Sequence, residues 1–382
     1  MRLTSEETEL VRSAEFLARN SGFINPALME YERPFNVAAI RTAAQLGLVG
    51  VRVPSKYGGL SRSFSCLAAV TEAIARIDFG FSLALANTMG IATRLTEVAS
   101  SDTLKVLMPG LLSGEQIGAA ALTEPGAGSD FSALTTYARR ADNGWIINGR
   151  KAWITNGAAA NVILVYAQTE PGSGPRGVAG FIVDAARAGF IREPAFELVE
   201  LNTAGIGGFM LDDYPALDNE MLEPPGKAFK SALALVNNAR TYVAAMCCGM
   251  VAEALDLAYE YGGRRSTFGK MLHQHQGWRW PLAEASTDLT AARALVQIAC
   301  DRIDAGEDVQ LEAAQAKLFA TRMAEQHLPR LAQALGAEAL RDIYPFSRHQ
   351  IAARSANLVD GSSEMLRERV FAGLKKEVSR KQ

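Results

Sequence analysis

The sequence predicts an α+β fold in which a helical domain, a β domain and a second helical domain follow one another. The spacing of apolar residues is helical up to about residue 115, strand-like from there to about residue 225, and helical again to the end. The chain has 382 residues, of which 48% are hydrophobic, and this is enough for a large core divided among domains. We therefore predict domains at 1–115, 116–225 and 226–382.

The N-terminal part shows helical periodicity in several segments. In the first of them, Leu10, Ala14, Phe16 and Leu17 are predicted to share one face of a helix. Proline and glycine in VPSKYGG interrupt the pattern and mark a break between helices. Further helices are predicted at residues 36–47, 64–76, 80–98 and 101–113.

Short runs of β-branched and aromatic residues follow, with turn residues between them. The runs are GWIINGRKAWITNG, NVILVYAQT and GVAGFIVDA. Within the first run, Asn148-Gly149 is typical of a two-residue hairpin turn. Helical spacing then returns in long segments, which are predicted at residues 228–262, 274–304, 309–336 and 361–378.

Composition and charge exclude several classes of protein. A net charge of −2 gives no basic surface for nucleic acid or for an anionic membrane. The N-terminus is charged and amphipathic, unlike a signal peptide, and no uncharged apolar run reaches the ~18 residues of a membrane span, so no membrane insertion is expected. The cysteines lack CxxC spacing, which indicates reduced thiols, a cytoplasmic protein and no metal site; they are Cys66, Cys247, Cys248 and Cys300.

The string ALTEPGAGSD, residues 121–130, opens the β part and suits a ligand. Its small residues let the backbone turn tightly and approach a bound group, while Thr123 and Ser129 offer hydroxyls. Such a loop can hold a phosphate or the edge of a heteroaromatic ring. Taken alone, the same residues are also typical of an ordinary surface turn.

The string WITNG, residues 153–157, follows about two dozen residues later. Trp153 and Thr155 alternate with Ile154, so a large ring and a hydroxyl share one face of a strand. This pair suits a flat cofactor, although a half-buried strand shows the same alternation.

Four motifs occur in an order that resembles the acyl-CoA dehydrogenase family. They are TEPGAGSD at 123–130, INGRKAWITNG at 147–157, RRSTFGKMLHQHQ at 264–276 and QALG at 333–336. The resemblance covers essentially the whole chain. It implies a middle β-barrel-like domain, a C-terminal four-helix bundle, and an FAD-dependent oxidoreductase acting on CH–CH groups.

By this resemblance, the β part holds the flavin ring. The backbones of Leu122 and Thr123, with the Thr123 hydroxyl, are expected to bond the pyrimidine side of the ring. Trp153 is expected to lie against the ring face opposite the substrate. Thr155 is expected near flavin N5, the atom that receives the hydride.

The resemblance also implies contacts beyond the ring. Ser129, approached through Gly128, is expected to reach the FAD pyrophosphate or the pantetheine of a thioester substrate. Ser362 and Glu364 are expected to contact the cofactor, and Arg240 is expected to contact the substrate. An acyl-CoA or acyl-carrier thioester is therefore the expected partner.

In this family the adenosine half of FAD is held across a subunit interface, so one group of residues is expected to reach a neighbour's cofactor. Arg265 suits the pyrophosphate because a guanidinium can bond two oxygens at once. The group also contains Thr267, Phe268, His275, Gln333 and Gly336. In isolation such residues are also typical of a solvated helix end, a core position or a satisfied histidine. The resemblance implies a homo-oligomer, either a dimer or a tetramer.

Asp360, in the string Val-Asp-Gly-Ser, occupies the position where most family members carry the glutamate that removes the substrate's α-proton. A base is needed because the α C–H of a thioester is weakly acidic and must ionise as hydride leaves Cβ. Burial would raise the pKa of Asp360, while a helix dipole would lower it. The structural alternative is a helix N-cap, worth ~1 kcal/mol. The second base position used by some relatives is Ala239 here, beside Arg240, and alanine accepts no proton.

The sequence departs from the family pattern in three places. Aspartate is one methylene shorter than glutamate, and a misplacement of ~1 Å can cost about 100-fold in rate. The string ELNTAGIGGFMLDDYPAL, residues 200–217, lacks the usual Gly-x-Arg and the closing Val-Pro along the expected pantetheine path. The string GAEAL, residues 336–340, replaces a glycine-rich turn.

The main functional hypothesis is FAD-dependent α,β-dehydrogenation of an acyl thioester, with Asp360 as base, flavin N5 as hydride acceptor and an electron-transferring flavoprotein as reoxidant. A first alternative is a flavin oxidase of the nitroalkane oxidase type, since that relative uses an aspartate base on acidic α-protons. A second is a dehydrogenase of carrier-protein-bound acyl groups in secondary metabolism. A third is a flavin-binding homologue without desaturase activity.

Overall fold

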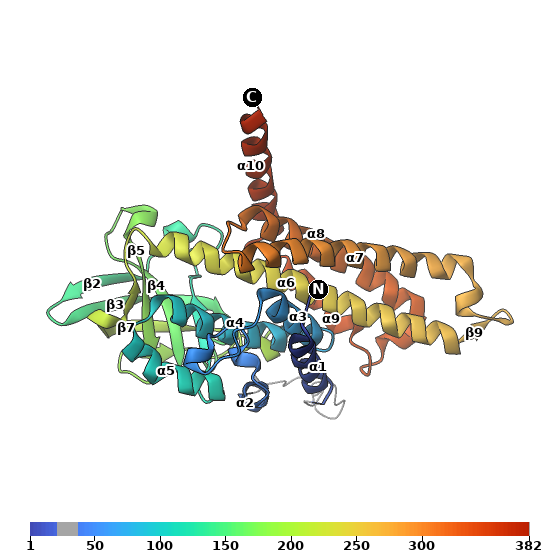
Figure 1. Cartoon of the computed structure of the whole chain (residues 1–382), viewed down its shortest axis with the longest axis horizontal. Coiled ribbons are helices and arrows are strands. Elements are labelled where there is room, and N and C mark those ends of the chain that lie inside the picture. Colours follow the sequence, from blue (N-terminus) through green and yellow to red (C-terminus); the bar gives the residue numbers. More distant parts are fainter. Residues whose placement is uncertain (21–36, 382) are drawn as a thin grey trace. The chain divides into compact units, whose positions relative to one another are not determined.

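Helices form at the segments that the apolar spacing predicts, but Phe16 was wrongly placed on the buried face of the first one. Phe16 is 67% exposed, whereas Ala14 and Leu17 are buried, because position 16 lies too far around the helix from them. The computed structural model describes residues 1–20 and 37–381 (Figure 1). The helices before the sheet are α1 (Ser5–Asn20), α2 (Val37–Gln45), α3 (Phe64–Ala75), α4 (Phe79–Val98) and α5 (Ser101–Ser113). Those after it are α6 (Ala228–Arg264), α7 (Gln276–Asp304), α8 (Gln310–Leu335), α9 (Phe346–Ala356) and α10 (Ser363–Lys381). Helix α9 has no counterpart among the predicted helices, and residue 36, where one predicted helix starts, lies outside the described residues.

A single sheet occupies the middle of the sequence, which confirms the predicted helical–β–helical order. Its strands pair in the order β6-β7-β3-β2-β4-β5-β8, and β1 pairs with β4 in parallel. The strands are β1 (Gly118–Ala121), β2 (Tyr137–Ala141), β3 (Gly144–Ile154), β4 (Val162–Gln168), β5 (Val178–Asp184), β6 (Phe190–Arg192), β7 (Gly207–Leu217) and β8 (Met221–Glu223). A separate small hairpin between α6 and α7 is formed by β9 (Ser266–Thr267) and β10 (Lys270–Met271).

The predicted hairpin turn at Asn148-Gly149 is wrong, because the chain turns earlier. The residues that connect β2 to β3 are Asp142 and Asn143. Gly149 lies inside β3, at an irregularity in the pairing of β3 with β7, and its φ is 152°. A Cβ at this position would lie 2.4 Å from Oγ1 of Thr136. The glycine therefore serves close packing within the sheet, not a turn.

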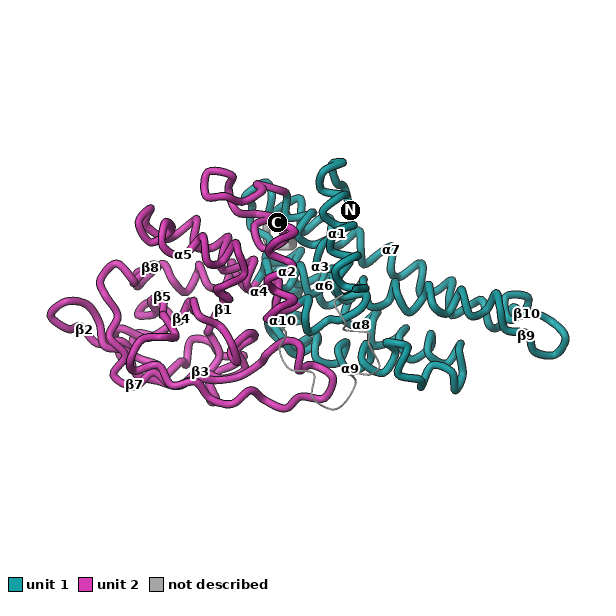
Figure 2. Tube along the Cα trace, turned by 90° about the horizontal axis from the view of Figure 1, so that it is seen from below, with its two compact units in different colours: residues 1–33, 63–82, 237–382 teal, residues 34–62, 83–236 magenta. Residues whose placement is uncertain are grey.

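The chain divides into two compact units, which Figure 2 shows in two colours. Unit 1 comprises residues 1–33, 63–82 and 237–382 and contains most of the long C-terminal helices. Unit 2 comprises residues 34–62 and 83–236 and contains the sheet. The helices that precede the sheet in the sequence are thus shared between the two units.

The core of unit 2 is built on the central strands of the sheet. Strand β4 is buried along its whole length, and its alternate residues Ile163 and Val165 pack in one cluster with Phe181 of β5 and Phe209 of β7. This is the period-two pattern of a strand that presents every second side chain to one core. The sheet is consequently a rigid base for the loops at its ends.

In unit 1, helix α6 lies against α3 and is tied to its surroundings by a buried carboxylate. A Cβ on Gly249 of α6 would lie 2.2 Å from the carbonyl oxygen of Glu72, so only glycine permits this approach. Glu253, whose side chain is 8% exposed, pairs with Arg19 at 3.0 Å and with Arg76 at 2.9 Å. A buried carboxylate with two guanidinium partners is well compensated.

The cysteine side chains and the long apolar helix α6 lie in the core. The four cysteines are free and buried. In the part of the chain that the structure describes, no group of three or more His, Cys, Asp or Glu is placed to hold a metal ion. Helix α6 is long and apolar enough to cross a membrane by length and composition, but 83% of its most apolar window is buried inside the structure, as in a core helix.

His349 makes the stability of unit 1 sensitive to acid. Burial lowers the pKa of this histidine to about 3, and its Nε2 lies 2.9 Å from the carbonyl oxygen of Arg76. As pH falls below about 6.5, His349 becomes protonated in the unfolded chain but stays neutral in the folded chain. The free energy of unfolding therefore falls by about 1.4 kcal/mol per pH unit. Urea unfolding at several pH values between about 6.5 and 5 should show this slope in the native protein, and His349→Gln should remove it. An equal slope in both proteins would contradict this role.

Candidate active site

The loop that follows β1 is a tight, open turn. The backbones of Glu124 and Ala127 exchange two hydrogen bonds, of 3.0 and 3.2 Å. Between and after them, Gly126 and Gly128 have negative φ, and a Cβ on either would meet no atom within 4 Å. Neither conformation nor packing within the chain demands glycine here. Their exposed backbone, with that of Ser129, is therefore open to close approach by a bound group.

A buried ion pair fixes this loop to strand β3. Nζ of Lys151 donates to Oε1 of Glu124 at 2.8 Å and to the carbonyl oxygen of Leu122 at 3.0 Å. The backbone N–H of Ala152 donates to the carbonyl oxygen of Thr123 at 3.1 Å. The two motifs expected to hold the flavin ring are thus joined by direct bonds within unit 2.

The charges of this pair follow from burial and from mutual attraction. Burial alone would raise the pKa of Glu124, but Lys151 and the hydrogen bonds from Thr135 and Thr136 lower it to about 2. Burial lowers the pKa of Lys151 to about 8, against the attraction of Glu124. Near neutral pH the carboxylate is therefore ionised, and the ammonium is its buried counter-charge.

Strand β3 ends in a sharp corner that exposes Trp153. The φ of Trp153 is 60° and its side chain is 58% exposed, with its ring 4.7 Å from that of Phe196. Thr155 is partly exposed, whereas Ile154 is buried, so the predicted alternation of the two faces is seen. The next residue, Asn156, is fully buried and its Nδ2 donates to three oxygens, those of Ala84, Gly118 and Thr88.

In unit 1, Asp360 lies on a short segment whose backbone is bound by two cationic side chains. Nε of Arg240, on α6, donates to the carbonyl oxygen of Asp360 at 2.9 Å. Nζ of Lys317, on α8, donates to the carbonyl oxygen of Gly361 at 2.7 Å and also to that of Val359. Three consecutive carbonyl oxygens are thus held, and the φ of Asp360 is 53°, in the left-handed region. Such a backbone persists only where its surroundings enforce it.

Loss of hydration governs the electrostatics of this cluster, although Asp360 keeps some exposed surface. Burial raises the pKa of Asp360, although Lys317 and Arg240 both act to lower it. Burial lowers the pKa of Lys317 to about 8 and also lowers that of Arg240. Tyr242, two residues after Arg240 on α6, is buried and interacts electrostatically with Asp360, and its pKa is raised. A carboxyl group with a raised pKa is suited to accept a proton.

The N-cap interpretation of Asp360 is not supported by the helix boundary. Helix α10 begins at Ser363, and the carbonyl of Ser362 accepts the hydrogen bond from Leu366, so Ser362 is the residue at the helix entrance. Glu364 lies in the first turn, and its pKa is lowered by backbone and Ser362 hydrogen bonds.

Three of the six residues expected to reach a neighbour's cofactor lie on or beside the β9–β10 hairpin. Phe268, at its tip, has a φ of 50° and is 94% exposed. Arg265 is exposed at the base of the hairpin. Nε2 of His275 lies 3.2 Å from the carbonyl oxygen of Thr267, so these two residues are in direct contact.

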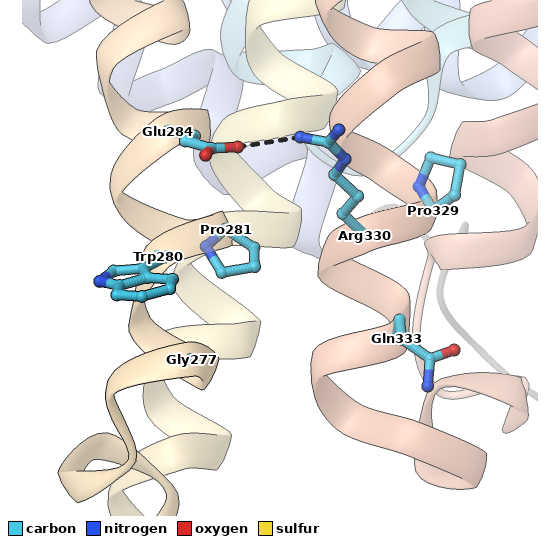
Figure 3. Close-up of a pocket in the computed structure, with 7 residues that line it drawn as sticks. All are labelled: Gly277, Trp280, Pro281, Glu284, Pro329, Arg330 and Gln333. Atoms are coloured by element: carbon cyan, nitrogen blue, oxygen red, sulfur yellow. Dashed lines mark hydrogen bonds and ion pairs between the residues drawn. The ribbon is translucent and has the colours of Figure 1, made fainter.

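Gln333 lies in a pocket of about 490 Å³ between helices α7 and α8 (Figure 3). Glu284 of α7 and Arg330 of α8 form an ion pair there, with 2.9 Å between Oε2 and Nη1. Trp280 contributes an indole ring that is 58% exposed. Gly336 follows at the end of α8 with a φ of 64°. The remaining lining residues are Gly277, Pro281 and Pro329.

Sequence reasoning missed the buried charges beside the loop at residues 121–130 and beside Asp360. Lys151 and Lys317 are each fully buried, and Glu124 is 3% exposed. One signal was available for Lys317, because it shares a helix face with Ala313 and Ala320, which also are buried. A lysine on an alanine-lined face is a candidate for burial, provided that oxygens are at hand to accept its hydrogen bonds.

Comparison with known sequences gives consistent results. The family descriptions "Acyl-CoA dehydrogenase, N-terminal domain", "middle domain" and "C-terminal domain" match residues 4–115, 119–214 and 226–375. An acyl-CoA dehydrogenase of Bacillus subtilis (strain 168) is 30% identical over 373 residues, which cover 96% of this chain and 97% of that protein.

Comparison with solved structures agrees. The structure of butyryl-CoA dehydrogenase from Megasphaera elsdenii has a TM-score of 0.93 and 27% sequence identity, and covers 98% of this chain and 99% of that one. An FAD complex of PigA has a TM-score of 0.91 at 23% identity, over 98% of this chain and 99% of that one, and is similar in fold.

The fold and the matches to known proteins define a flavin-dependent dehydrogenase. The chain belongs to the acyl-CoA dehydrogenase family, and it is an oxidoreductase that acts on CH–CH groups with FAD as cofactor. The residues present fit that cofactor. The open backbone at Gly126 and Gly128 and the exposed ring of Trp153 offer a flat group both hydrogen bonds and an aromatic surface.

Proposed function

We propose that the protein dehydrogenates an acyl-CoA between Cα and Cβ, with Asp360 accepting the α-proton. The observation that supports this most is the Asp360 segment. Its carboxyl group has a pKa raised by burial, and its backbone is bound by Arg240 and Lys317. Bound FAD would supply the acceptor for the hydride that leaves Cβ.

The chain's own part in this reaction is to hold and move one proton. The carboxylate of Asp360 takes the α-proton, and a raised pKa increases its affinity for that proton. Lys317 and Arg240 lie close enough to stabilise the ionised form before the reaction. Leu122, Thr123, Ser129, Trp153 and Thr155 would hold the flavin.

A homo-oligomer is part of this proposal. Phe268 is almost fully exposed on a hairpin beside exposed Arg265, and a large exposed ring is typical of a surface that a partner covers. We infer that this hairpin, with Gln333, contacts the FAD of a second copy. An electron-transferring flavoprotein is proposed to reoxidise the reduced flavin.

The test is an anaerobic titration of the purified flavoprotein with short, branched, aromatic and long acyl-CoA thioesters, with the flavin absorbance followed throughout. One class is expected to bleach the flavin band and to yield the 2,3-enoyl-CoA by mass spectrometry. Light scattering on the same sample should give a mass above that of one chain.

Other results would overturn the proposal. A flavin that no acyl-CoA bleaches contradicts acyl-CoA dehydrogenation, and rapid turnover of nitroalkanes with oxygen alone would replace it by the oxidase alternative. A mass equal to one chain contradicts the shared cofactor site. Reoxidation by oxygen as fast as by an electron-transferring flavoprotein contradicts the proposed acceptor.

A further inference from the structure

The side chain of Lys317 has no solvent-exposed surface, and this needs a reason. An ammonium group loses its hydration on burial, which costs several kcal/mol unless oxygen atoms replace the water. Lys317 finds these oxygens in the carbonyls of Val359 and Gly361, the residues on either side of Asp360. The ammonium of Lys317 is thus hydrogen-bonded to the residue before the proposed base and to the residue after it.

The attachment is specific to one segment. Both hydrogen bonds from Lys317 that the structure shows go to residues next to Asp360, and they extend from helix α8 to the link before α10. Arg240 holds the intervening carbonyl from helix α6. Two long helices therefore fix a segment that has no regular secondary structure of its own.

We propose that Lys317 is a positioning residue for the reaction: it holds the Asp360 carboxylate in place by binding the backbone on both sides of it. This inference rests on the proposed function, in which Asp360 is the base. The left-handed conformation of Asp360 supports it, because such a backbone relaxes when the contacts that enforce it are removed. A base displaced by ~1 Å loses about 100-fold in rate.

The electrostatic role of Lys317 adds a second consequence. Asp360 is faced by Lys317 from α8 and by Arg240 and Tyr242 from α6, and both cations lower the pKa of the carboxyl group. Removal of the Lys317 charge therefore raises the pKa of Asp360 further. Flavin reduction requires the ionised carboxylate of Asp360. In a plot of the reduction rate against pH, the fall at acid pH (the acid limb) should therefore move to higher pH.

The experiment compares the flavin-loaded native protein with Lys317→Met, which keeps the volume of the side chain and removes its donors. With the acyl-CoA that bleaches the native protein, the rate constant of flavin reduction should fall about 100-fold, while the dissociation constant of the thioester stays within about twofold. The acid limb of the rate should shift upward in Lys317→Met and stay near its native position in Lys317→Arg. Thr321→Val, one turn further along the buried face of α8, is the matched control and should keep the native rate.

Hydrogen exchange supplies a readout that needs no substrate. In Lys317→Met the amides of residues 358–366 should exchange about 10- to 100-fold faster, as expected for the loss of hydrogen bonds to a charged donor, and Thr321→Val should leave them unchanged. Unchanged exchange in Lys317→Met, or a native reduction rate with only a lower melting temperature, would overturn the inference. If no acyl-CoA bleaches even the native protein, the proposed function fails, while exchange still decides whether Lys317 holds the segment.

Discussion

Replacement of Asp360 by asparagine is expected to slow flavin reduction by an acyl-CoA by about 100- to 10,000-fold, the range usual for the loss of a general base. Asparagine has nearly the shape of aspartate and accepts no proton. The flavin content should stay near one per chain, because Asp360→Asn preserves the size of the side chain and the backbone contacts of the segment. Stopped-flow bleaching of the flavin band, with the native protein alongside, measures this effect.

The stability of the same variant separates a base from a structural residue. Helix α10 starts at Ser363, so Asp360→Asn removes no cap and its urea midpoint should stay close to that of the native protein. A native reduction rate in Asp360→Asn would show that another group takes the proton. Asp360→Glu is the companion variant: it keeps the carboxylate but moves it by one methylene, so it should be slower than the native protein and faster than Asp360→Asn.

Replacement of Glu124 by glutamine is expected to lower the free energy of unfolding by about 3–5 kcal/mol, because it leaves the ammonium of Lys151 buried without its counter-charge. Glu124 is 3% exposed and Lys151 has no exposed surface, so water cannot compensate. The loop that carries Leu122 is hydrogen-bonded to Lys151, so loss of the ion pair should loosen this loop. The Glu124→Gln protein should therefore release flavin on dilution. Urea unfolding and flavin absorbance after gel filtration measure the two effects.

A neighbouring ion pair gives a matched control for this result. Arg150, next to Lys151 on strand β3, pairs with Glu193 at 2.6 Å, and the Arg150 side chain is 58% exposed. Glu193→Gln should leave the unfolding midpoint almost unchanged, since exposed pairs contribute little. Equal losses in Glu124→Gln and Glu193→Gln would contradict the importance assigned to burial. The double variant Glu124→Gln/Lys151→Met should recover much of the loss, because no unpaired charge then remains.

Acid should weaken the native protein through Glu124 as well. The pKa of Glu124 is depressed in the folded protein, to about 2, so its contribution to stability is complete above its unfolded value near 4.5 and is lost as pH falls through this interval. The contribution from His349 is lost at higher pH, from about 6.5 downward, so the two groups act in succession.

The regular elements of this chain were predictable because their apolar spacing is strong. The segments predicted at 101–113 and 228–262 match α5 and α6 closely. Helix α9 was missed because polar Arg348 and His349 lie among its buried residues and break the apolar pattern that a sequence reader follows.

The site was predictable only in part. The motifs predict Asp360 as the base and residues 121–130 as a flavin loop, and both assignments stay predictions. The burial of Lys151 and Lys317 was not predicted, because a lysine is normally exposed and only the folded chain shows which oxygens surround it; the alanine-lined helix face of Lys317 was the one signal available. The hairpin turn was wrongly predicted at Asn148-Gly149, because a sequence does not distinguish a glycine required by close packing from a glycine required by a turn.

The left-handed backbone at position 360 bears on why the proposed base is an aspartate. Among residues other than glycine, asparagine, aspartate and histidine are several-fold enriched in that conformation, and glutamate is not among them. Of the enriched types, only aspartate carries a carboxylate. The shorter side chain is thus the acid that the conformation favours, although a glutamate of this chain, Glu200, also has a φ of 60°. The residue type at position 360 is therefore set by the backbone as well as by the reach of the carboxylate.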